Sequence, residues 1–188
     1  YALDTETGAK EWNFTTGDRV VASPTVVNGT VFIGSEDETM YALDADTGQK
    51  EWDYAAGDSV KGSATVVNGI VYFGTNFNKK IHAVDAETGS VEWTATASSY
   101  VQSSPTVKNG TVYIGSNGDA VHALDADTGS YVWNYTTDGV VQSSPTVAGG
   151  TVYVGSGGTK LHAIDADTGS LKWDYDTGDG VKSSPTVK

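Results

Sequence analysis

Apolar residues along the chain fall into short runs separated by turns rich in glycine, asparagine and aspartate. In the third repeat the runs at 101–107, 111–116 and 120–125 are rich in β-branched and aromatic residues, and a fourth run surrounds Trp133. Such residues favour strands. Val112-Tyr113-Ile114 is apolar without alternation, which indicates a strand covered on both faces. No segment shows the 3.6-residue apolar spacing of a helix, so the pattern predicts an all-β protein with four strands per repeat.

The turns between these runs carry their own structural signals. Asn109-Gly110 is a two-residue hairpin signal, because both central residues of a type I′ turn have positive φ. Asp125 precedes Ala126-Asp127-Thr128-Gly129, where its carboxylate can accept backbone N–H bonds while the glycine takes a conformation that other residues resist. The hairpin signal recurs at Asn28-Gly29 and Asn68-Gly69, and Gly149-Gly150 replaces it in one repeat.

The five tryptophans of the chain mark the repeat, because they lie 40, 41, 40 and 40 residues apart. A period near 40 with several short strands is the signature of β-propeller blades. The extra residue of the longer step falls in 76–80, a loop that we expect on one rim and expect to be the first place for a local contact. The predicted units of this single domain are 17–56, 57–97, 98–137 and 138–177, flanked by 1–16 and 178–188.

The flanking segments predict a split blade. Residues 1–16 read as the third and fourth strands of a unit, whereas 178–188 reads as a first strand, and no second strand accompanies it. We therefore expect four complete blades plus a split, incomplete fifth, within a fragment of a longer propeller. The alternative is a closed five-bladed ring with one defective blade.

Every unit contains the pattern Ala-x-Asp-x-x-Thr-Gly-x-x-x-Trp, as in Ala123, Asp125, Thr128, Gly129 and Trp133. This pattern resembles the tryptophan-docking motif of the pyrroloquinoline-quinone (PQQ)-like β-propeller family, and it covers nearly the whole chain. The resemblance implies that each indole lies between the alanine of its own unit and the glycine of the adjacent blade. The docking residues implied are Trp12, Trp52, Trp93, Trp133, Trp173, Ala42, Ala83, Ala123, Ala163, Gly48, Gly89, Gly129 and Gly169.

The resemblance also implies two functional branches. Dehydrogenases of the family hold PQQ with a vicinal disulfide, a tryptophan, a calcium ion and a catalytic aspartate, whereas binding members include the lipoprotein of the barrel-assembly machinery and archaeal surface proteins. This chain has no cysteine, and docking accounts for every tryptophan. We therefore expect no PQQ, no catalytic residue and a non-catalytic binding or scaffold module. The alternatives are a fragment of a PQQ-dependent oxidoreductase whose cofactor-binding segments lie outside this chain, and an engineered repeat protein without a native ligand.

The charge of the chain limits its partners. It has 24 acidic and 11 basic residues, for a formal net charge of -13. Such a surface repels phosphate backbones and anionic lipid, so we expect no nucleic-acid partner and no membrane insertion. A protein partner, or the remaining blades of a longer propeller, fits better. The acidic composition also suggests a halophilic archaeon as the source and an extracellular or cell-surface location.

Several residue patterns resemble parts of metal or catalytic sites. Asp44 to Gly48 resembles the start of a calcium loop, but no bidentate glutamate follows consistently, so turn capping is favoured. His82, His122 and His162 occupy equivalent strand positions in different blades, which predicts separate surface sites rather than one metal centre. Ser103-Ser104 and its counterparts lack a nucleophile elbow, so we interpret them as small residues where inner strands crowd together. We therefore expect no metal site.

The position before those serines is the strongest candidate for binding. If the first strand is innermost, its side chains form a ring at the channel mouth that could hold an anion, a carboxylate or ordered water. The alternative is a solvated lining without a ligand. The ring residues are Val21, Lys61, Gln102, Gln142 and Lys182. Separately, Asn-x-Thr triplets suited to N-glycosylation begin at Asn13, Asn28, Asn109 and Asn134.

Overall fold

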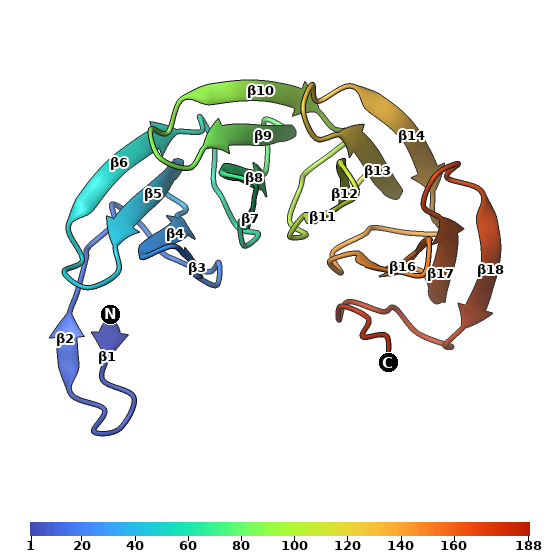
Figure 1. Ribbon diagram of the computed structural model, residues 1–188. Helices are drawn as coiled ribbons and strands as arrows, with labels where there is room; N and C mark the ends of the chain where they lie inside the picture. The colour runs from blue at the N-terminus through green and yellow to red at the C-terminus, as the bar shows by residue number, and fades with distance from the viewer.

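The computed structural model describes all of residues 1–188 and contains strands but no helix. Four four-stranded antiparallel sheets, named here blades 1 to 4, and one two-stranded sheet, the half-blade, stand side by side around an open arc (Figure 1). The half-blade contains β1 (Ala2–Leu3) and β2 (Lys10–Trp12). Blade 1 contains β3 (Thr25–Val27), β4 (Thr30–Gly34), β5 (Thr39–Asp44) and β6 (Lys50–Ala55).

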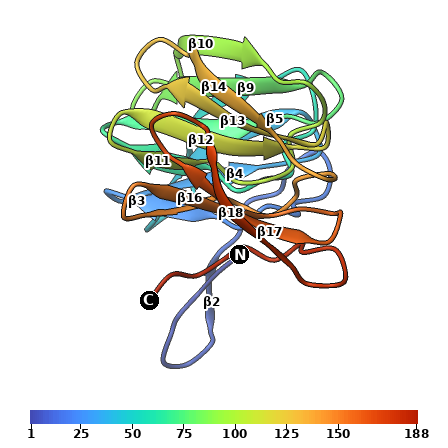
Figure 2. The same cartoon turned by 90° about the vertical axis from the view of Figure 1, so that its right-hand side faces the viewer.

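The remaining blades repeat the same order. Blade 2 contains β7 (Thr65–Val67), β8 (Ile70–Gly74), β9 (Lys80–Asp85) and β10 (Val91–Thr96). Blade 3 contains β11 (Thr106–Lys108), β12 (Thr111–Ser116), β13 (Ala120–Asp125) and β14 (Tyr131–Thr136). Blade 4 contains β15 (Thr146–Ala148), β16 (Thr151–Gly155), β17 (Lys160–Asp165) and β18 (Leu171–Asp176). In each blade consecutive strands are neighbours, with the first strand on the inside of the arc and the fourth on the outside (Figures 1 and 2).

The predicted turns are present. Asn109 and Gly110 have φ values of 50° and 75°, as a type I′ hairpin requires. The Oδ1 atom of Asp125 accepts hydrogen bonds of 2.8 Å from both the backbone N–H and the hydroxyl of Thr128. These bonds lower the pKa of the Asp125 carboxyl, so the repeated aspartates cap turns.

The first strand of each blade is shorter than the sequence predicts. In blade 3 only Thr106–Lys108 pairs with β12, and residues 101–105 form no ladder. Pro105 has no N–H to donate, and the N–H groups of Val101 and Ser104 bond to Thr75 and Ser144 in the flanking blades instead. The final segment, 177–188, likewise forms no strand, because it has no second strand to pair with.

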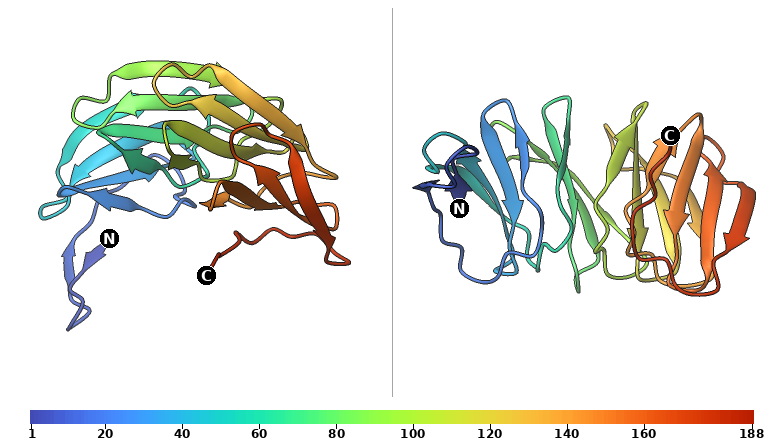
Figure 3. Two further views of the ribbon diagram at one scale, coloured as in Figure 1. Left: turned by 45° about the vertical axis from the view of Figure 1, so that its right-hand side comes forward. Right: turned by 90° about the horizontal axis from the view of Figure 1, so that it is seen from below.

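The hydrophobic cores lie between blades rather than within one. One core cluster joins Phe32 and Trp52 of blade 1 to Val71 and Phe73 of blade 2, and similar clusters join blades 2 and 3 and blades 3 and 4. The view from below shows the blades packed face to face (Figure 3). Each sheet is therefore apolar on both faces, as the unalternating strands predicted.

The arc does not close. The half-blade pairs with no other strand, and it lies at one end of the arc while the segment 177–188 lies at the other (Figure 1). The structure is thus an incomplete propeller, and the alternative of a closed five-bladed ring is not the arrangement found. No helix of the chain could cross a membrane, since it has none.

Candidate functional site

Each tryptophan but the last contacts the next blade. The indole Nε1 of Trp93 donates a 2.8 Å hydrogen bond to the carbonyl oxygen of Ala126. A Cβ built on Gly129 would lie 2.5 Å from the same indole, so only glycine fits there. Ala83 is the antiparallel partner of Trp93 within its own blade. The same contacts join Trp12 to Gly48 and Ala45, Trp52 to Gly89 and Ala86, and Trp133 to Gly169 and Ala166.

Trp173 stands at the end of the arc and has no following blade. It is 46% exposed, whereas Trp52 and Trp93 are each 8% exposed. Ala163 is its partner within blade 4, and the ring of Tyr153 lies 5.9 Å from it. Within this chain, four of the five indoles therefore make the contact between blades.

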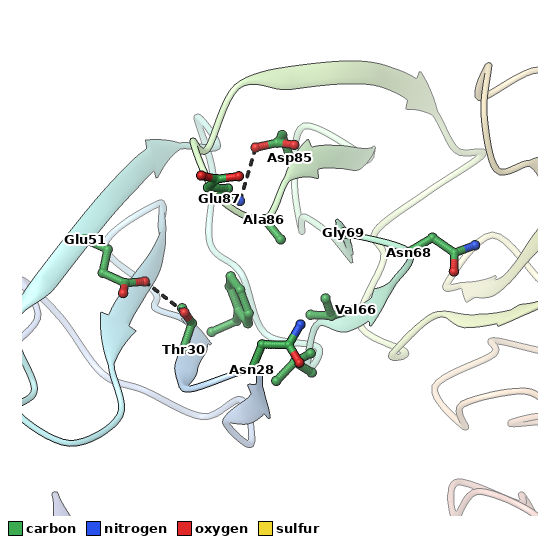
Figure 4. A pocket seen from close by; sticks show the side chains of 11 residues that line it. Asn28, Thr30, Glu51, Val66, Asn68, Gly69, Asp85, Ala86 and Glu87 are labelled. Carbon is green, nitrogen blue, oxygen red and sulfur yellow. Dashed lines mark hydrogen bonds between the residues drawn. The ribbon is translucent and has the colours of Figure 1, made fainter.

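A groove between blades 1 and 2 marks one departure from the repeat. Tyr72 and Tyr113 donate hydrogen bonds of 3.2 Å to Ala126 and Ala166, but Phe32 has no hydroxyl, so Ala86 accepts a bond from Trp52 alone. The groove encloses about 680 Å³ beside Phe32 (Figure 4). Its polar wall consists of Asn28, Thr30, Glu51, Asn68, Asp85 and Glu87.

Two carboxylates of that groove already accept hydrogen bonds from groups of the chain. Glu51 accepts a 3.0 Å bond from the Thr30 hydroxyl, and Asp85 caps its own turn by accepting the backbone N–H of Glu87 (Figure 4). No group of three histidine, aspartate or glutamate side chains is placed to hold a metal ion anywhere in the chain. The groove therefore offers a negative, shallow surface rather than a metal centre.

Serine hydroxyls connect the inner segments of all blades. The backbone N–H of Ser63 donates a 3.0 Å bond to the Oγ of Ser104, one blade further on. The same bond, also of 3.0 Å, runs from Ser23 to Ser63, from Ser104 to Ser144 and from Ser144 to Ser184. Sequence reasoning assigned these serines only a small size and missed this serine ladder. Its signal was a serine at the same place in all five units.

The three histidines are buried between blades, so the prediction of surface sites is wrong. His82, His122 and His162 are 2–3% exposed. The Nδ1 of His82 lies 3.2 Å from the hydroxyl of Tyr54 in blade 1, and its ring stacks on Phe73. Burial, followed by the charge of Lys80, lowers the pKa of His82 to about 4. This histidine is therefore neutral and packs as part of the core.

His162 has a different set of partners. Its Nε2 lies 3.0 Å from Oδ1 of Asp138, and its Nδ1 lies 3.3 Å from the hydroxyl of Tyr135 in blade 3. Burial raises the pKa of Asp138, but bonds from Ser156, Thr159 and His162 outweigh it and leave the pKa at about 2. Asp138 also accepts a hydrogen bond from Ser156, which holds the carboxylate in place. The trio of Ser156, Asp138 and His162 thus joins two blades, and a nucleophilic role is not favoured because His162 contacts the aspartate rather than the serine.

Two of the predicted ring residues, Gln102 and Gln142, belong to an amide belt that crosses blades 2 to 4. The belt comprises Asn76, Gln102, Asn117 and Gln142. The Nε2 of Gln102 donates a 3.1 Å bond to Asn76, and the Oε1 of Gln102 accepts bonds of 3.2 Å from Gln142 and 3.4 Å from Asn117. The Oδ1 of Asn117 is buried and accepts no hydrogen bond from the chain.

The lysines of the predicted ring do not join this belt. Lys61 pairs with Glu36 at 3.4 Å, and Arg19 pairs with the same carboxylate at 2.6 Å. Lys182 and Val21 are exposed, and Lys182 lies near the end of the arc. The structure therefore brings Gln102 and Gln142 together and leaves the two lysines apart, with Lys61 sharing the carboxylate of Glu36 with Arg19.

An aromatic pair stands on the rim beside the belt. Phe77, in the loop that carries the extra residue, is 62% exposed. Its ring packs edge-on against Tyr100, with centroids 5.0 Å apart. Asn76 directly precedes Phe77, and Gln102 lies two residues after Tyr100, so the pair is next to the belt in sequence, although Asn76 itself is buried. Exposed aromatic groups next to hydrogen-bonding amides are typical of protein-binding surfaces.

The model of the family described as outer membrane protein assembly factor BamB matches residues 1–100 and 78–188. The chain belongs to this family. No curated protein sequence matches it significantly.

Solved structures of PQQ-like propellers share its fold. BamB from Moraxella catarrhalis superposes with a TM-score of 0.81 at 22% identity over 94% of this chain. The quinohemoprotein alcohol dehydrogenases of Pseudomonas putida HK5 and Comamonas testosteroni give TM-scores of 0.75 and 0.73, also at 22% identity, over 90% and 87% of this chain. The chain spans 59% of BamB and 36% of each dehydrogenase. It is thus similar in fold to both branches of the family.

The residues present do not fit PQQ as the dehydrogenase branch would hold it. The chain has no cysteine for a vicinal disulfide. Four indoles pack on glycines of the next blade and are occupied by that contact. No acidic cluster could hold calcium beside it. No step through the quinone follows from this chain.

Proposed function

We propose that the chain is a non-catalytic binding module that holds an extended segment of a partner protein against the amide belt and the Phe77–Tyr100 pair. The observation that carries this proposal is the exposed ring of Phe77, packed against Tyr100, next to a hydrogen-bonded row of amides. The residues that dominate binding at protein interfaces are enriched in aromatic side chains such as tyrosine. The amides present both donors and acceptors, which suits the peptide backbone.

The name of the matched family refers to protein assembly, which is the role of a binding factor, and supports a protein partner. An exported location at the cell surface is part of this proposal.

The test is selection of peptides from a displayed random library, followed by affinity measurement with purified variants. Phe77→Ala and Gln102→Ala should each weaken the selected peptides about tenfold or more. Val132→Ala is the matched control, because Val132 is 51% exposed on the outer strand of blade 3. Peptides that bind all variants alike would place binding elsewhere and refute the proposal.

A second candidate rests on the fold shared with the quinohemoprotein alcohol dehydrogenases. In this alternative the chain is part of a PQQ-dependent oxidoreductase whose cofactor-binding segments lie outside these residues. Titration of the chain with PQQ and calcium, followed by tryptophan fluorescence, tests this candidate. Saturable micromolar binding would favour the oxidoreductase.

A further inference from the structure

The groove between blades 1 and 2 lies where blade 1 lacks a hydroxyl that blades 2 and 3 possess. The hydroxyls of Tyr72 and Tyr113 each bond at 3.2 Å to an alanine carbonyl oxygen of the following blade. Phe32 has the same place in the register of blade 1 and cannot make this bond. The groove of about 680 Å³ is bordered by Phe32 and by Ala86, whose oxygen is the matching acceptor.

The carbonyl oxygen of Ala86 consequently has one donor fewer than its counterparts. It accepts a 3.0 Å bond from Nε1 of Trp52 and no second one. A carbonyl oxygen has two lone pairs. The oxygen of Ala126 uses both, since it accepts bonds from Trp93 and Tyr72. At Ala86 the second lone pair is left for a donor that enters the groove.

The wall of the groove is negatively charged. Three carboxylates line it, and no lysine or arginine does. Glu51 and Glu87 are exposed, and Asp85 is half-buried. None of the three forms an ion pair within the chain, and the bonds that Glu51 and Asp85 accept come from uncharged groups. Uncompensated negative charge around an open acceptor favours a cation that carries N–H groups.

We infer that this groove binds the guanidinium group of an arginine side chain on a partner protein (Figure 4). A guanidinium is always charged and holds five N–H donors in one plane, so it can donate to the oxygen of Ala86 and to a wall carboxylate together. The methylene stem of arginine can lie along Val27 and Val66, which form the apolar part of the lining. A lysine ammonium has fewer donors and a compact charge, so it should bind more weakly.

This site is separate from the amide belt and the Phe77–Tyr100 pair. Asn68 and Gly69 line the groove and directly precede β8, whereas Asn76 and Phe77 follow that strand. The two surfaces therefore lie at opposite ends of blade 2. Both blades that form the groove are complete four-stranded sheets. The inference is thus independent of the proposed function.

The probe is the blocked tripeptide acetyl-Gly-Arg-Gly-amide, compared with its citrulline analogue, which has a similar shape without the charge. NMR signals of the five indole N–H groups report where the peptide binds, because only that of Trp52 donates to Ala86. At about 0.1 M sodium chloride, where charges are only partly screened, the arginine peptide should shift the Trp52 signal saturably. The signals of Trp93 and Trp133 should stay in place, and the citrulline peptide should shift none.

Two variants alter the groove and one serves as a matched control. Phe32→Tyr should abolish the shift, because the new hydroxyl occupies the free space and bonds to Ala86. Glu51→Gln should weaken binding about two- to fivefold, since it removes one charge of the wall. Glu92→Gln makes the same change at the equivalent position of blade 2, outside the groove, and should bind like the wild type. Circular dichroism checks that each variant is folded.

Several results would overturn the inference. A Trp52 signal that does not shift saturably would show that the groove does not bind the guanidinium group. Equal binding of the citrulline peptide, or of acetyl-Gly-Lys-Gly-amide, would show that this group is not what is recognised. Unchanged binding by Phe32→Tyr would place the peptide elsewhere. Equal weakening by Glu51→Gln and Glu92→Gln would show that only the net charge of the protein matters.

Discussion

The indole Nε1 of Trp93 lies 2.8 Å from the carbonyl oxygen of Ala126, and this bond joins the outer strand of blade 2 to a turn of blade 3. The hydroxyl of Tyr72 bonds to the same oxygen at 3.2 Å. A single carbonyl thus accepts two side chains from the preceding blade. Since repeat proteins are stabilised by contacts between neighbours, this point is where stability should be most sensitive to substitution.

Trp93→Ala should lower the free energy of unfolding by about 3–5 kcal/mol, because it removes a buried indole and its hydrogen bond. Trp173→Ala is the matched control, since Trp173 is already 46% exposed and should cost less than half as much. Urea unfolding followed by far-UV circular dichroism measures both. Equal losses would show that the contact between blades contributes little.

Phe32→Tyr should stabilise the chain by about 1 kcal/mol. Phe32 occupies the position of Tyr72 and Tyr113, and its new hydroxyl would reach the oxygen of Ala86, which now accepts a bond only from Trp52. The reciprocal control Tyr72→Phe should destabilise by a similar amount. A shift of both urea midpoints in the same direction would show that the hydrogen bond from the tyrosine hydroxyl to the alanine oxygen does not stabilise the contact between blades.

Ser104→Ala should cost about 1 kcal/mol, because it leaves the backbone N–H of Ser63 without its acceptor. Ser23→Ala is the matched control. It removes the same hydroxyl, but Ser23 is the first residue of the ladder and its hydroxyl accepts no N–H bond. Its unfolding midpoint should stay at the wild-type value. Equal unfolding midpoints for the two variants would show that the serine ladder does not contribute to stability.

Stability should fall as pH falls from about 6.5 toward about 4. Burial, aided by the charge of Lys80, holds the pKa of His82 near 4, below its ordinary value of 6.5. The unfolded state therefore takes up this proton first, and the stabilisation present above pH 6.5 is lost as pH approaches 4. His122 adds to this dependence, because burial lowers its pKa too.

His82→Asn removes one of these groups while keeping an amide for Tyr54. The slope of unfolding free energy against pH, measured in urea at pH 5 to 7, should decrease by up to about 1.4 kcal/mol per pH unit. An unchanged slope would mean that His82 titrates normally in the folded chain.

Salt should stabilise the chain, because its net charge of -13 opposes compaction. Raising sodium chloride from about 0.1 M to about 1 M shortens the Debye length from about 10 Å to about 3 Å. The urea midpoint should rise over this range, as expected for a protein from a saline environment. A constant midpoint would argue against salt adaptation.

Local residue chemistry predicted much of the fold. The strands 111–116 and 120–125 match β12 and β13 to the residue, because their turns are marked by Asn109-Gly110 and Gly129. The motif spacing also anticipates which tryptophan meets which glycine, since each blade repeats one register.

Contacts made across blades by single atoms were not predictable. The bond from Ser63 to Ser104 joins residues 41 positions apart, and nothing in the spacing distinguishes it from mere small size. The inner strand was overestimated at 101–105 because its N–H groups bond to flanking blades. The amide belt was not predicted because Asn76 and Asn117 follow β8 and β12, whereas Gln102 lies in the segment before β11, and only the fold brings them together.

All bonds of the serine ladder point the same way, from each unit's N–H to the following unit's hydroxyl. Every junction therefore carries the same serine bond, whichever two units meet there. Duplication or deletion of one 40-residue segment would leave this bond in place at each remaining junction.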